Sequence, residues 1–323
     1  MTLPLGATPR PGPTLVLTSS WPRTGDELAG TFVRTDTLVR ARTGARVVVA
    51  APVGPGRAHG GAGLEVVDVA HHGLFGSPGA AWRARQDPRR LLGIWPFFQA
   101  IRALVARVEP TTIVAHWLLP TGALARRCAP HGCRLELVAH GADVRLLEAM
   151  PRPVARAVLS ATTRGAEVCA VSEALADRLV GLLPALRGGV RVAPMPLATD
   201  DARIVEDARD AGGRLRGQHR PPLHVVAARL VASKGIERAI EHVAARGGSL
   251  VLVGDGPRRA ALVAHARALG VELHAVGARP HHESLAWLCA ADVVLAPLAA
   301  GEGAPTVVRE ARALGRPVLT FES

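Results

Sequence analysis

The 323-residue sequence has no tyrosine and no asparagine, and Lys234 is its single lysine, so arginine supplies almost all of the positive charge. Because the composition is biased against lysine, the single lysine that is present could have a specific role. Lysine carries a compact, mobile ammonium, whereas the guanidinium of arginine is planar and needs a partner of matching shape. Lys234 is therefore either a cation placed against a crowded anion or an ordinary exposed residue of a first helical turn.

Cysteine and aromatic residues are also scarce, and each shortage excludes a class of protein. The cysteines, Cys128, Cys133, Cys169 and Cys289, form no C-x-x-C pair and have no histidine at zinc spacing, so we expect free thiols in a reducing compartment. Aromatic residues make up 3% of the chain, and the arginines are dispersed singly. Because base stacking needs aromatic side chains, we expect no nucleic-acid partner despite the net charge of +12.

The chain contains no uninterrupted apolar run of about 18 residues, the minimum length for a membrane-spanning helix. The nearest candidate, residues 91–105, is interrupted by Pro96, Gln99 and Arg102. The N-terminal stretch has too many prolines for a signal peptide. We expect a cytoplasmic protein whose first half, with 23 arginines against 14 acidic residues in 1–200, is the part that faces an anionic membrane surface.

Short β-branched runs alternate with longer helical patterns along the chain, which is typical of parallel sheets. Several runs are apolar on both faces, as expected of strands covered by helices on both sides. A polar stretch at 200–222 separates two halves of the same kind. The pattern predicts an α/β protein of two Rossmann-like, doubly wound domains, 1–198 and 199–323, that face each other across a cleft. The predicted strands are 14–20, 45–52, 64–70, 111–117, 134–140, 167–172, 223–230, 249–256, 271–277, 292–298 and 316–321.

Two acidic residues flank a predicted helix that begins near Pro305 and ends at Gly315. Glu310 falls at the margin of the apolar stripe of this helix, where a half-buried carboxylate needs hydrogen-bond donors. Paired sugar hydroxyls would serve, and so would an arginine. Glu302 precedes the helix N-terminus, whose amides favour negative charge, so it either caps the helix or binds a ligand.

Arg229 and Lys234, in RLVASKGIE, follow a predicted strand and open a predicted helix. They would project toward one spot at the carboxyl edge of the sheet, where ligands of such sheets bind. Gly254, in LVGDGP, ends the next strand and would let a backbone approach a ligand. This turn is not G-x-G-x-x-G, so it gives no nicotinamide-binding fingerprint.

Taken in order, ARLVASKG, LVGDGPRRAAL, AVGARPHHESLAWLCAADVVLAPL and EGAPTVVREARALGRPV resemble the family 4 glycosyltransferases of GT-B architecture. Looser matches in the first half are SSWPRTGDELAGTFV, AHWLLPTGALA, LVAHGADV and VCAVSEAL. The resemblance implies a retaining hexosyltransferase that uses a nucleoside-diphosphate sugar and a lipid-linked or polysaccharide acceptor of the cell envelope. Family members usually continue beyond the last predicted strand, so we expect that C-terminal helices are missing or that a partner chain completes the domain.

The resemblance also implies residue roles. Arg229 and Lys234 would hold the diphosphate, Glu310 the ribose hydroxyls and Glu302 the transferred sugar, with His140 beside that sugar. No D-x-D motif is present, so we expect no metal, and cationic side chains would neutralise the leaving group. The other implied donor-side residues are Gly254, Gly277, Arg279, Gly303, Ala304, Pro305 and Thr306, and the implied acceptor-side residues are Gly25, His116 and Asp143.

Alternative functions stay open at this point. The chain could be a non-catalytic nucleotide-sugar-binding remnant or a partner subunit, and a weaker alternative is a GT-B nucleotide-sugar epimerase. His116 and His140 both end predicted strands, where a purely structural histidine is also common. The pairs His71–His72 and His281–His282 lack a third ligand, so we predict no metal site at either.

Overall fold

The structure is a computed structural model that describes residues 12–22, 30–42, 44–53, 63–75, 80–298 and 305–322. The chain divides into two compact units, the first containing residues 12–22 and 30–196 and the second residues 197–322. The domain boundary expected after residue 198 falls within the short 3-10 turn Ala198–Asp200 (η4), just beyond this division. Four of the candidate residues lie outside the described ranges: Gly25, Glu302, Gly303 and Ala304.

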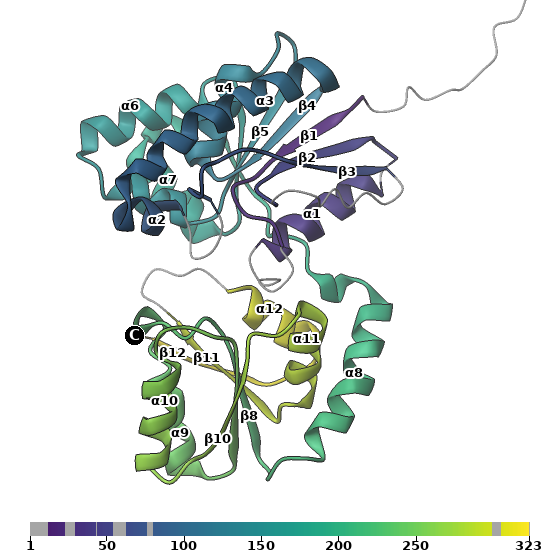
Figure 1. Ribbon diagram of the computed structural model, residues 1–323, viewed down its shortest axis with the longest axis vertical. Helices are drawn as coiled ribbons and strands as arrows, with labels where there is room; N and C mark the ends of the chain where they lie inside the picture. The colour runs from purple at the N-terminus through teal and green to yellow at the C-terminus, as the bar shows by residue number, and fades with distance from the viewer. Residues whose placement is uncertain are drawn as a thin grey trace, which may run out of the picture. The chain divides into compact units, whose positions relative to one another are not determined.

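The first unit is built on a seven-stranded sheet in the order β3-β2-β1-β4-β5-β6-β7, and every strand pair is parallel (Figure 1). Its central strands are apolar on both faces, and all five residues of β2 are buried. The strands are Thr14–Leu17 (β1), Val47–Ala51 (β2), Leu64–Asp68 (β3), Thr112–His116 (β4), Arg134–Ala139 (β5), Glu167–Ala170 (β6) and Val190–Val192 (β7).

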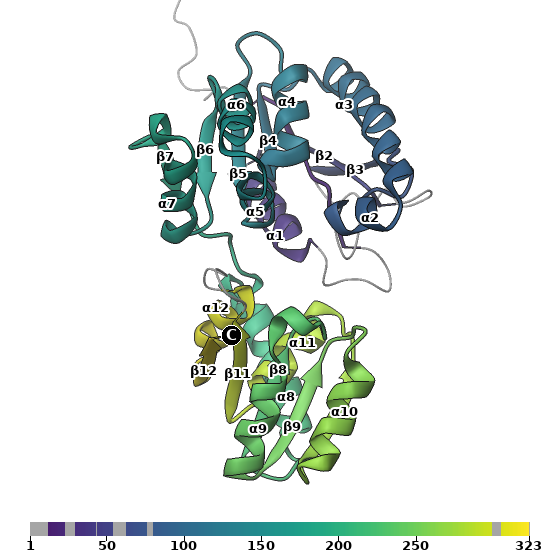
Figure 2. The same ribbon diagram turned by 90° about the vertical axis from the view of Figure 1, so that its left-hand side faces the viewer.

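Helices cover both faces of this sheet. Val33 of α1 packs on one face, and a larger core on the other face includes Phe97 and Ile101 of α3, Leu147 of α5 and Leu179 of α7. Figure 1 shows α1 apart from the other labelled helices of the unit, and Figure 2 gives the same unit turned by 90°. The helices are Thr31–Ala41 (α1), Ala80–Gln86 (α2), Ile94–Val108 (α3), Ala123–Cys128 (α4), Ala142–Glu148 (α5), Arg152–Thr163 (α6) and Glu173–Leu182 (α7).

The second unit repeats this plan on a five-stranded parallel sheet in the order β10-β9-β8-β11-β12. Helices α9 and α10 pack on one face of the sheet, and α8, α11 and α12 pack on the other. The strands are Leu223–Ala227 (β8), Ser249–Val253 (β9), Glu272–Gly277 (β10), Val293–Leu298 (β11) and Val318–Glu322 (β12). The helices are Ala202–Arg216 (α8), Glu237–Arg246 (α9), Arg259–Ala268 (α10), His281–Ala290 (α11) and Thr306–Ala313 (α12).

The strand order reverses between β1 and β4 in the first sheet and between β8 and β11 in the second. Ligands of doubly wound sheets bind beyond the carboxyl ends of the strands at such a reversal. His116 is the last residue of β4, and Arg229 follows the end of β8. The predicted fold class, two doubly wound parallel-sheet domains, is confirmed, and its topology places candidate residues at both reversals.

One helical segment, Pro88–Val108, is long and apolar enough to cross a membrane by length and composition, among the residues that the structure describes. It comprises the 3-10 turn Pro88–Gly93 (η1) and α3. Phe97 and Ile101 of α3 are fully buried in the core of the first unit. In this fold the segment is therefore a helix packed on a sheet.

Candidate functional site

The connection after β8 carries the two cations predicted to bind a diphosphate. β8 ends at Ala227, and Lys234 closes the 3-10 turn Ala232–Lys234 (η5). Gly235 then takes a left-handed conformation, with φ of 59°, before α9 begins. Arg229 is exposed and Lys234 is half-buried. Both lie at the carboxyl edge of the second sheet, beside the reversal of strand order; the convergence of their side chains on one anion stays a prediction.

The connection after β9 lies directly against this cationic segment. A Cβ added at Gly254, where φ is 141°, would fall 1.9 Å from the carbonyl oxygen of Ala228, and one at Gly256 would fall 2.4 Å from that of Leu230. The amide of Leu230 donates to the carbonyl of Asp255 at 2.9 Å. The close approach that the structure shows at Gly254 is to the segment that carries Arg229, and it fixes that segment in place; the approach of a ligand to Gly254 stays a prediction.

The connection after β10 is joined to the same edge. The amide of Gly254 donates to the carbonyl of Gly277 at 2.8 Å. This hydrogen bond joins the connection after β9 directly to the end of β10. Gly277 has φ of 81°, and Arg279 Nε donates to the carbonyl of Val276 at 3.0 Å. The stretch predicted to pass the nucleobase, Gly277 to Arg279, therefore lies next to the turn that holds the cationic segment.

Glu310 lies on α12 and is 6% exposed, more deeply withdrawn from water than a position at the margin of an apolar stripe predicts. Its Oε1 lies 2.8 Å from Nε2 of His281, the first residue of α11. From the sequence we considered an arginine as a hydrogen-bond donor to Glu310, and the structure has His281 in that role. Pro305 precedes α12 and Thr306 is its first residue, as the helix-start pattern predicted. From the sequence we considered His281 only as a metal ligand, and we predicted no metal site there because a third ligand is lacking.

In the first unit the structure brings together His116, His140 and Asp143, which come from the ends of β4 and β5 and from α5. Nδ1 of His116 lies 2.9 Å from Nε2 of His140. Asp143 is 2% exposed. Its carboxylate accepts hydrogen bonds from the backbone amides of Leu118 at 2.7 Å, His140 at 3.2 Å and Val144 at 3.0 Å. The carboxylate ties the connections after β4 and β5 to each other, next to the reversal of strand order between β1 and β4.

A charged network that sequence reasoning missed lies next to His116, and its acids, Asp36 and Glu136, are buried. Nε2 of the fully buried His116 faces Oδ2 of Asp36 on α1 at 3.4 Å. Asp36 also accepts from Nε of Arg40 at 2.7 Å, and Nη2 of Arg40 donates to Glu136 at 2.7 Å. Glu136 in turn lies 3.2 Å from Nη2 of Arg191. Alternating charges therefore run from Arg191 through Glu136 and Arg40 to Asp36, which faces His116.

The surroundings of His140 decide its charge. Its ring lies 5.0 Å from the ring of Phe32 and 4.9 Å from that of Trp117, measured between centroids. Burial lowers the pKa of His140 well below its ordinary value, and neighbouring His116 lowers it further. His140 is therefore a neutral imidazole near pH 7, able to donate one hydrogen bond and accept another.

The two acids of this centre respond differently to burial. Burial alone would raise the pKa of Asp36, but its contacts with His116 and Arg40 outweigh burial and leave that pKa below the usual value. Burial raises the pKa of Asp143, against the opposing effect of the amides that it accepts. Asp36 is thus the fixed negative charge next to His116.

Trp117 adopts φ of 69° and ψ of 127°, a conformation that costs a non-glycine residue about 1–3 kcal/mol. Its amide donates to the carbonyl of Val138 at 2.8 Å, and its carbonyl accepts from the hydroxyl of Thr121 at 2.9 Å. These bonds hold the strained backbone so that the indole ring lies against His140. The signal in the sequence was the AHW triplet, whose tryptophan we did not single out.

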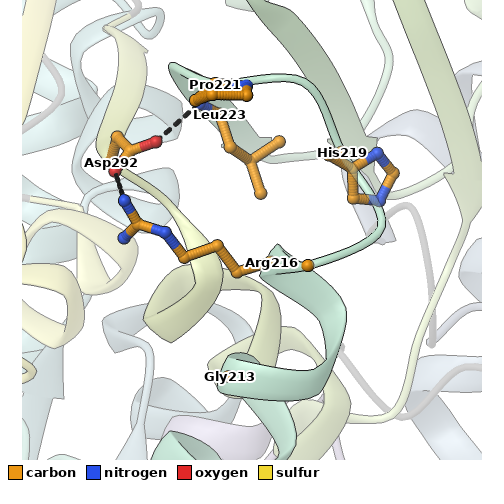
Figure 3. A pocket seen from close by; sticks show the side chains of 7 residues that line it. Gly213, Arg216, His219, Pro221, Leu223 and Asp292 are labelled. Atoms are coloured by element: carbon orange, nitrogen blue, oxygen red, sulfur yellow. Dashed lines mark hydrogen bonds and ion pairs between the residues drawn. The ribbon is translucent and has the colours of Figure 1, made fainter.

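A cavity of about 310 Å³ lies at the opposite edge of the second sheet, where β8 begins. Figure 3 shows Asp292 between Arg216, with which it forms an ion pair, and the amide of Leu223, which donates to it at 2.8 Å. His219 and Pro221 also line the cavity. This arrangement joins α8 to the start of β8. The cavity therefore lies at the end of the sheet opposite the carboxyl edge that carries Arg229 and Lys234. Within the described ranges, no group of three or more His, Cys, Asp or Glu side chains is arranged to hold a metal ion.

Comparisons with known proteins give a family match within the second unit. Residues 221–323 match the family described as glycosyl transferases group 1. No curated protein sequence matches the chain.

Solved structures share the fold of the whole chain. The sucrose-phosphate synthase of Thermosynechococcus elongatus aligns with a TM-score of 0.67 at 20% identity, covering 96% of this chain and 81% of that one. Anabaena Alr3699/HepE in complex with UDP aligns with a TM-score of 0.65 at 16% identity, covering 96% and 80%. WaaG, a glycosyltransferase involved in lipopolysaccharide biosynthesis, aligns with a TM-score of 0.64 at 18% identity, covering 95% and 80%. The fold is that of GT-B glycosyltransferases, and the family match and fold together support an enzyme of this class.

Proposed function

We propose that the chain is a retaining, metal-independent glycosyltransferase that moves a hexose from a nucleoside-diphosphate sugar to a lipid-linked or polysaccharide acceptor. One observation carries the proposal. In the part of the chain that matches the glycosyltransferase family, the cationic segment Arg229–Lys234 lies beyond the end of β8, where the order of the second sheet reverses. That is the position at which doubly wound sheets bind ligands.

In this proposal the second unit binds the donor. Arg229 and Lys234 neutralise the diphosphate as negative charge develops on it. Glu310 accepts hydrogen bonds from the ribose hydroxyls through Oε2, because His281 occupies Oε1. The backbone from Gly277 to Arg279 passes the nucleobase, and Pro305 and Thr306 bring the N-terminus of α12 toward the phosphates. Glu302, Gly303 and Ala304 complete this set by resemblance.

The first unit contributes to the sugar and acceptor side. His140, held neutral by burial, donates a hydrogen bond to the transferred sugar, and His116 and Asp143 position it through the contacts described above. Gly25 belongs to this side by resemblance alone. Asp36 and Trp117 act through His116 and His140 and are positioning residues.

For the chemical step we propose attack on the face that the leaving group departs from. The bond between the anomeric carbon and the diphosphate oxygen breaks, the acceptor oxygen bonds to that carbon, and the acceptor proton passes to the departing diphosphate. The sequence identifies no carboxylate nucleophile for a double displacement, and it contains no D-x-D motif for a divalent ion. Intact-mass measurement during turnover should find no covalent glycosyl-enzyme. Finding one would refute direct attack by the acceptor and favour a double displacement.

We further propose that the enzyme works in the cytoplasm, at the inner face of the membrane, in cell-envelope synthesis. The support is the charge asymmetry of the chain, with 23 basic against 14 acidic residues in 1–200 and 16 against 13 in 201–323. A basic unit is attracted to anionic lipids that would also hold a lipid-linked acceptor.

The test is release of nucleoside diphosphate from a panel of UDP-, GDP- and ADP-sugars in the presence of candidate acceptors. The unaltered chain should release nucleotide from at least one donor. Lys234→Ala should lower that rate by about 10²–10³, as for removal of a group that stabilises developing charge. Arg246→Ala, which removes an exposed cation at the end of α9, is the matched control and should leave the rate unchanged.

The alternatives give different results in the same assay. Thermal stabilisation by UDP or GDP without release under any acceptor would favour the non-catalytic nucleotide-sugar-binding protein or partner subunit. Isomerised sugar in the absence of an acceptor would favour the epimerase. Equal rates for Lys234→Ala and the unaltered chain would refute the role assigned to the cationic segment.

A further inference from the structure

Large apolar side chains are exposed together at the start of the η1–α3 segment. Leu91 is 49% exposed, Leu92 is 71% exposed and Trp95 is 65% exposed, the last two being the highest values among the exposed large hydrophobic residues of the described chain. We call Leu91, Leu92, Trp95 and Phe98 the α3 ridge. Exposed apolar side chains that occur singly need no explanation, but three within five positions form a surface.

The ridge has a fixed shape because the segment beneath it is anchored. A Cβ at Gly93 would fall 2.0 Å from the carbonyl oxygen of His71, so η1 rests directly on the connection after β3. Arg83 and Arg90 both donate to the carbonyl of Gly73, at 3.1 and 3.2 Å. On the inner side, Phe97 and Ile101 are fully buried.

The outer face of α3 has the chemistry of a membrane interface. Trp95 and Phe98 lie one turn apart with ring centroids 6.0 Å from each other, and the guanidinium of Arg102 lies 5.9 Å above the Phe98 ring. Tryptophan and arginine both combine an apolar body with a polar end, which suits them to the headgroup region of a bilayer.

The segment that carries the ridge is strongly basic. Residues 80–108 contain six arginines and one acidic residue, Asp87. Arg85, Arg89 and Arg102 are exposed, and Arg89 lies on η1 two positions before Leu91. An apolar ridge with an arginine border is complementary to a surface of anionic headgroups over acyl chains.

We propose that the α3 ridge is the surface by which the chain docks on an anionic lipid bilayer. Leu91, Leu92 and Trp95 insert at the boundary between headgroups and acyl chains, while Arg85, Arg89 and Arg102 contact lipid phosphates. The segment does not cross the bilayer, because its other face forms the core of the first unit. The ridge gives the peripheral location of the proposed function a defined surface, and it does not depend on sugar transfer.

The experiment is co-flotation of the full chain with vesicles of phosphatidylcholine alone or with about one third phosphatidylglycerol, at low and high salt. Binding should require the anionic lipid and weaken with salt, since screening acts over about 10 Å at 0.1 M. The double variant Leu92→Gln/Trp95→Gln should lose at least about tenfold in partitioning, and Arg89→Gln/Arg102→Gln should lose the salt-sensitive part. Val154→Gln, on α6 of the same unit and 48% exposed, is the matched control and should bind normally.

Two further readouts keep the outcome interpretable. Thermal stabilisation by UDP or GDP should be the same for the ridge variants as for the unaltered chain, which separates this proposal from the proposed function and shows that the variants fold. Equal flotation of the Leu92→Gln/Trp95→Gln variant and the unaltered chain would overturn the proposal. So would a dimer, measured by light scattering, that dissociates in this variant while vesicles bind none of the proteins, because the ridge would then be a contact between copies.

Discussion

At the scale of single residues, the contact between His281 and Glu310 changes what Glu310 can do. A carboxylate that is 6% exposed needs donors, and His281 supplies one at 2.8 Å. The imidazole occupies one oxygen and fixes the rotation of the carboxylate about its last torsion. His281 is thus a positioning residue for the ribose contact of Glu310.

His281→Gln should weaken binding of UDP or GDP about tenfold, equivalent to about 1.4 kcal/mol, because the buried carboxylate loses its fixed donor geometry. His282→Gln is the matched control, since His282 is the exposed next residue of α11. Calorimetric titration of both variants checks this. Equal affinities for the two variants would show that His281 does not orient Glu310.

A second prediction at this scale concerns pH. His140 has a pKa lowered by burial and by His116, so the folded state holds it neutral while the unfolded chain protonates it below about pH 6.5. The unfolded state therefore binds more protons as pH falls, and folding stability is lost on acidification below pH 6.5.

Denaturant unfolding between pH 7.5 and 5 should show this loss, and His140→Gln should reduce its slope. An NMR titration gives the direct check, because the His140 imidazole signal should not shift through pH 6.5. A normal titration of His140 near pH 6.5 would contradict the packing of its ring against Phe32 and Trp117.

At the scale of elements, the contact between α8 and α11 depends on one of two adjacent glycines. A Cβ at Gly212 would lie 2.6 Å from Cβ of Cys289 and 2.8 Å from the carbonyl oxygen of Ala286, whereas one at Gly213 would meet nothing within 4 Å. The helices approach closely because position 212 has no side chain.

Gly212→Ala should therefore destabilise the second unit by about 1–3 kcal/mol through overpacking. Gly213→Ala should be neutral or stabilise it by up to about 1 kcal/mol, because alanine is the better helix former. Urea unfolding of the two variants provides the comparison. If both variants were equally stable, the close packing of α8 on α11 would be wrong.

The elements themselves could be predicted from the sequence because burial on both faces leaves a clear pattern. Each of the eleven predicted runs overlaps an observed strand, for example Val47–Ala51 and Ser249–Val253, in which every residue is buried. The strand that was missed, Val190–Val192, has three residues, is partly exposed and includes Arg191. An edge strand of this kind lacks the apolar pattern on which prediction depends.

The candidate site was predictable only in part, for a related reason. The ends of strands can be read from a sequence, so Arg229, His116 and His140 could be placed at the carboxyl edges. The contacts between elements could not. Asp36 meets His116 because α1 packs beside β4, and His281 meets Glu310 because α11 and α12 share a face of the sheet. The sequence around these residues contains no local pattern that predicts contacts between different elements.

At the scale of the whole molecule, the two units use one plan for different chemistry. Each is a doubly wound parallel sheet with candidate residues at the reversal of strand order. The first unit gathers a neutral histidine, buried charge pairs and an exposed apolar ridge with a basic border. The second gathers cations and a buried carboxylate. In the proposed division of labour, the first serves the acceptor and the membrane, and the second serves the nucleotide.

The central claim is that the segment from Arg229 to Lys234 binds the diphosphate of the donor. Calorimetric titration with UDP, GDP and ADP tests it most directly, because binding needs neither acceptor nor turnover. The account predicts that one of these nucleotides binds, that Lys234→Ala and Lys234→Arg both weaken its binding at least about tenfold, and that Arg246→Ala does not. Unchanged affinity in Lys234→Ala, or binding of none of the three by the folded chain, would contradict it.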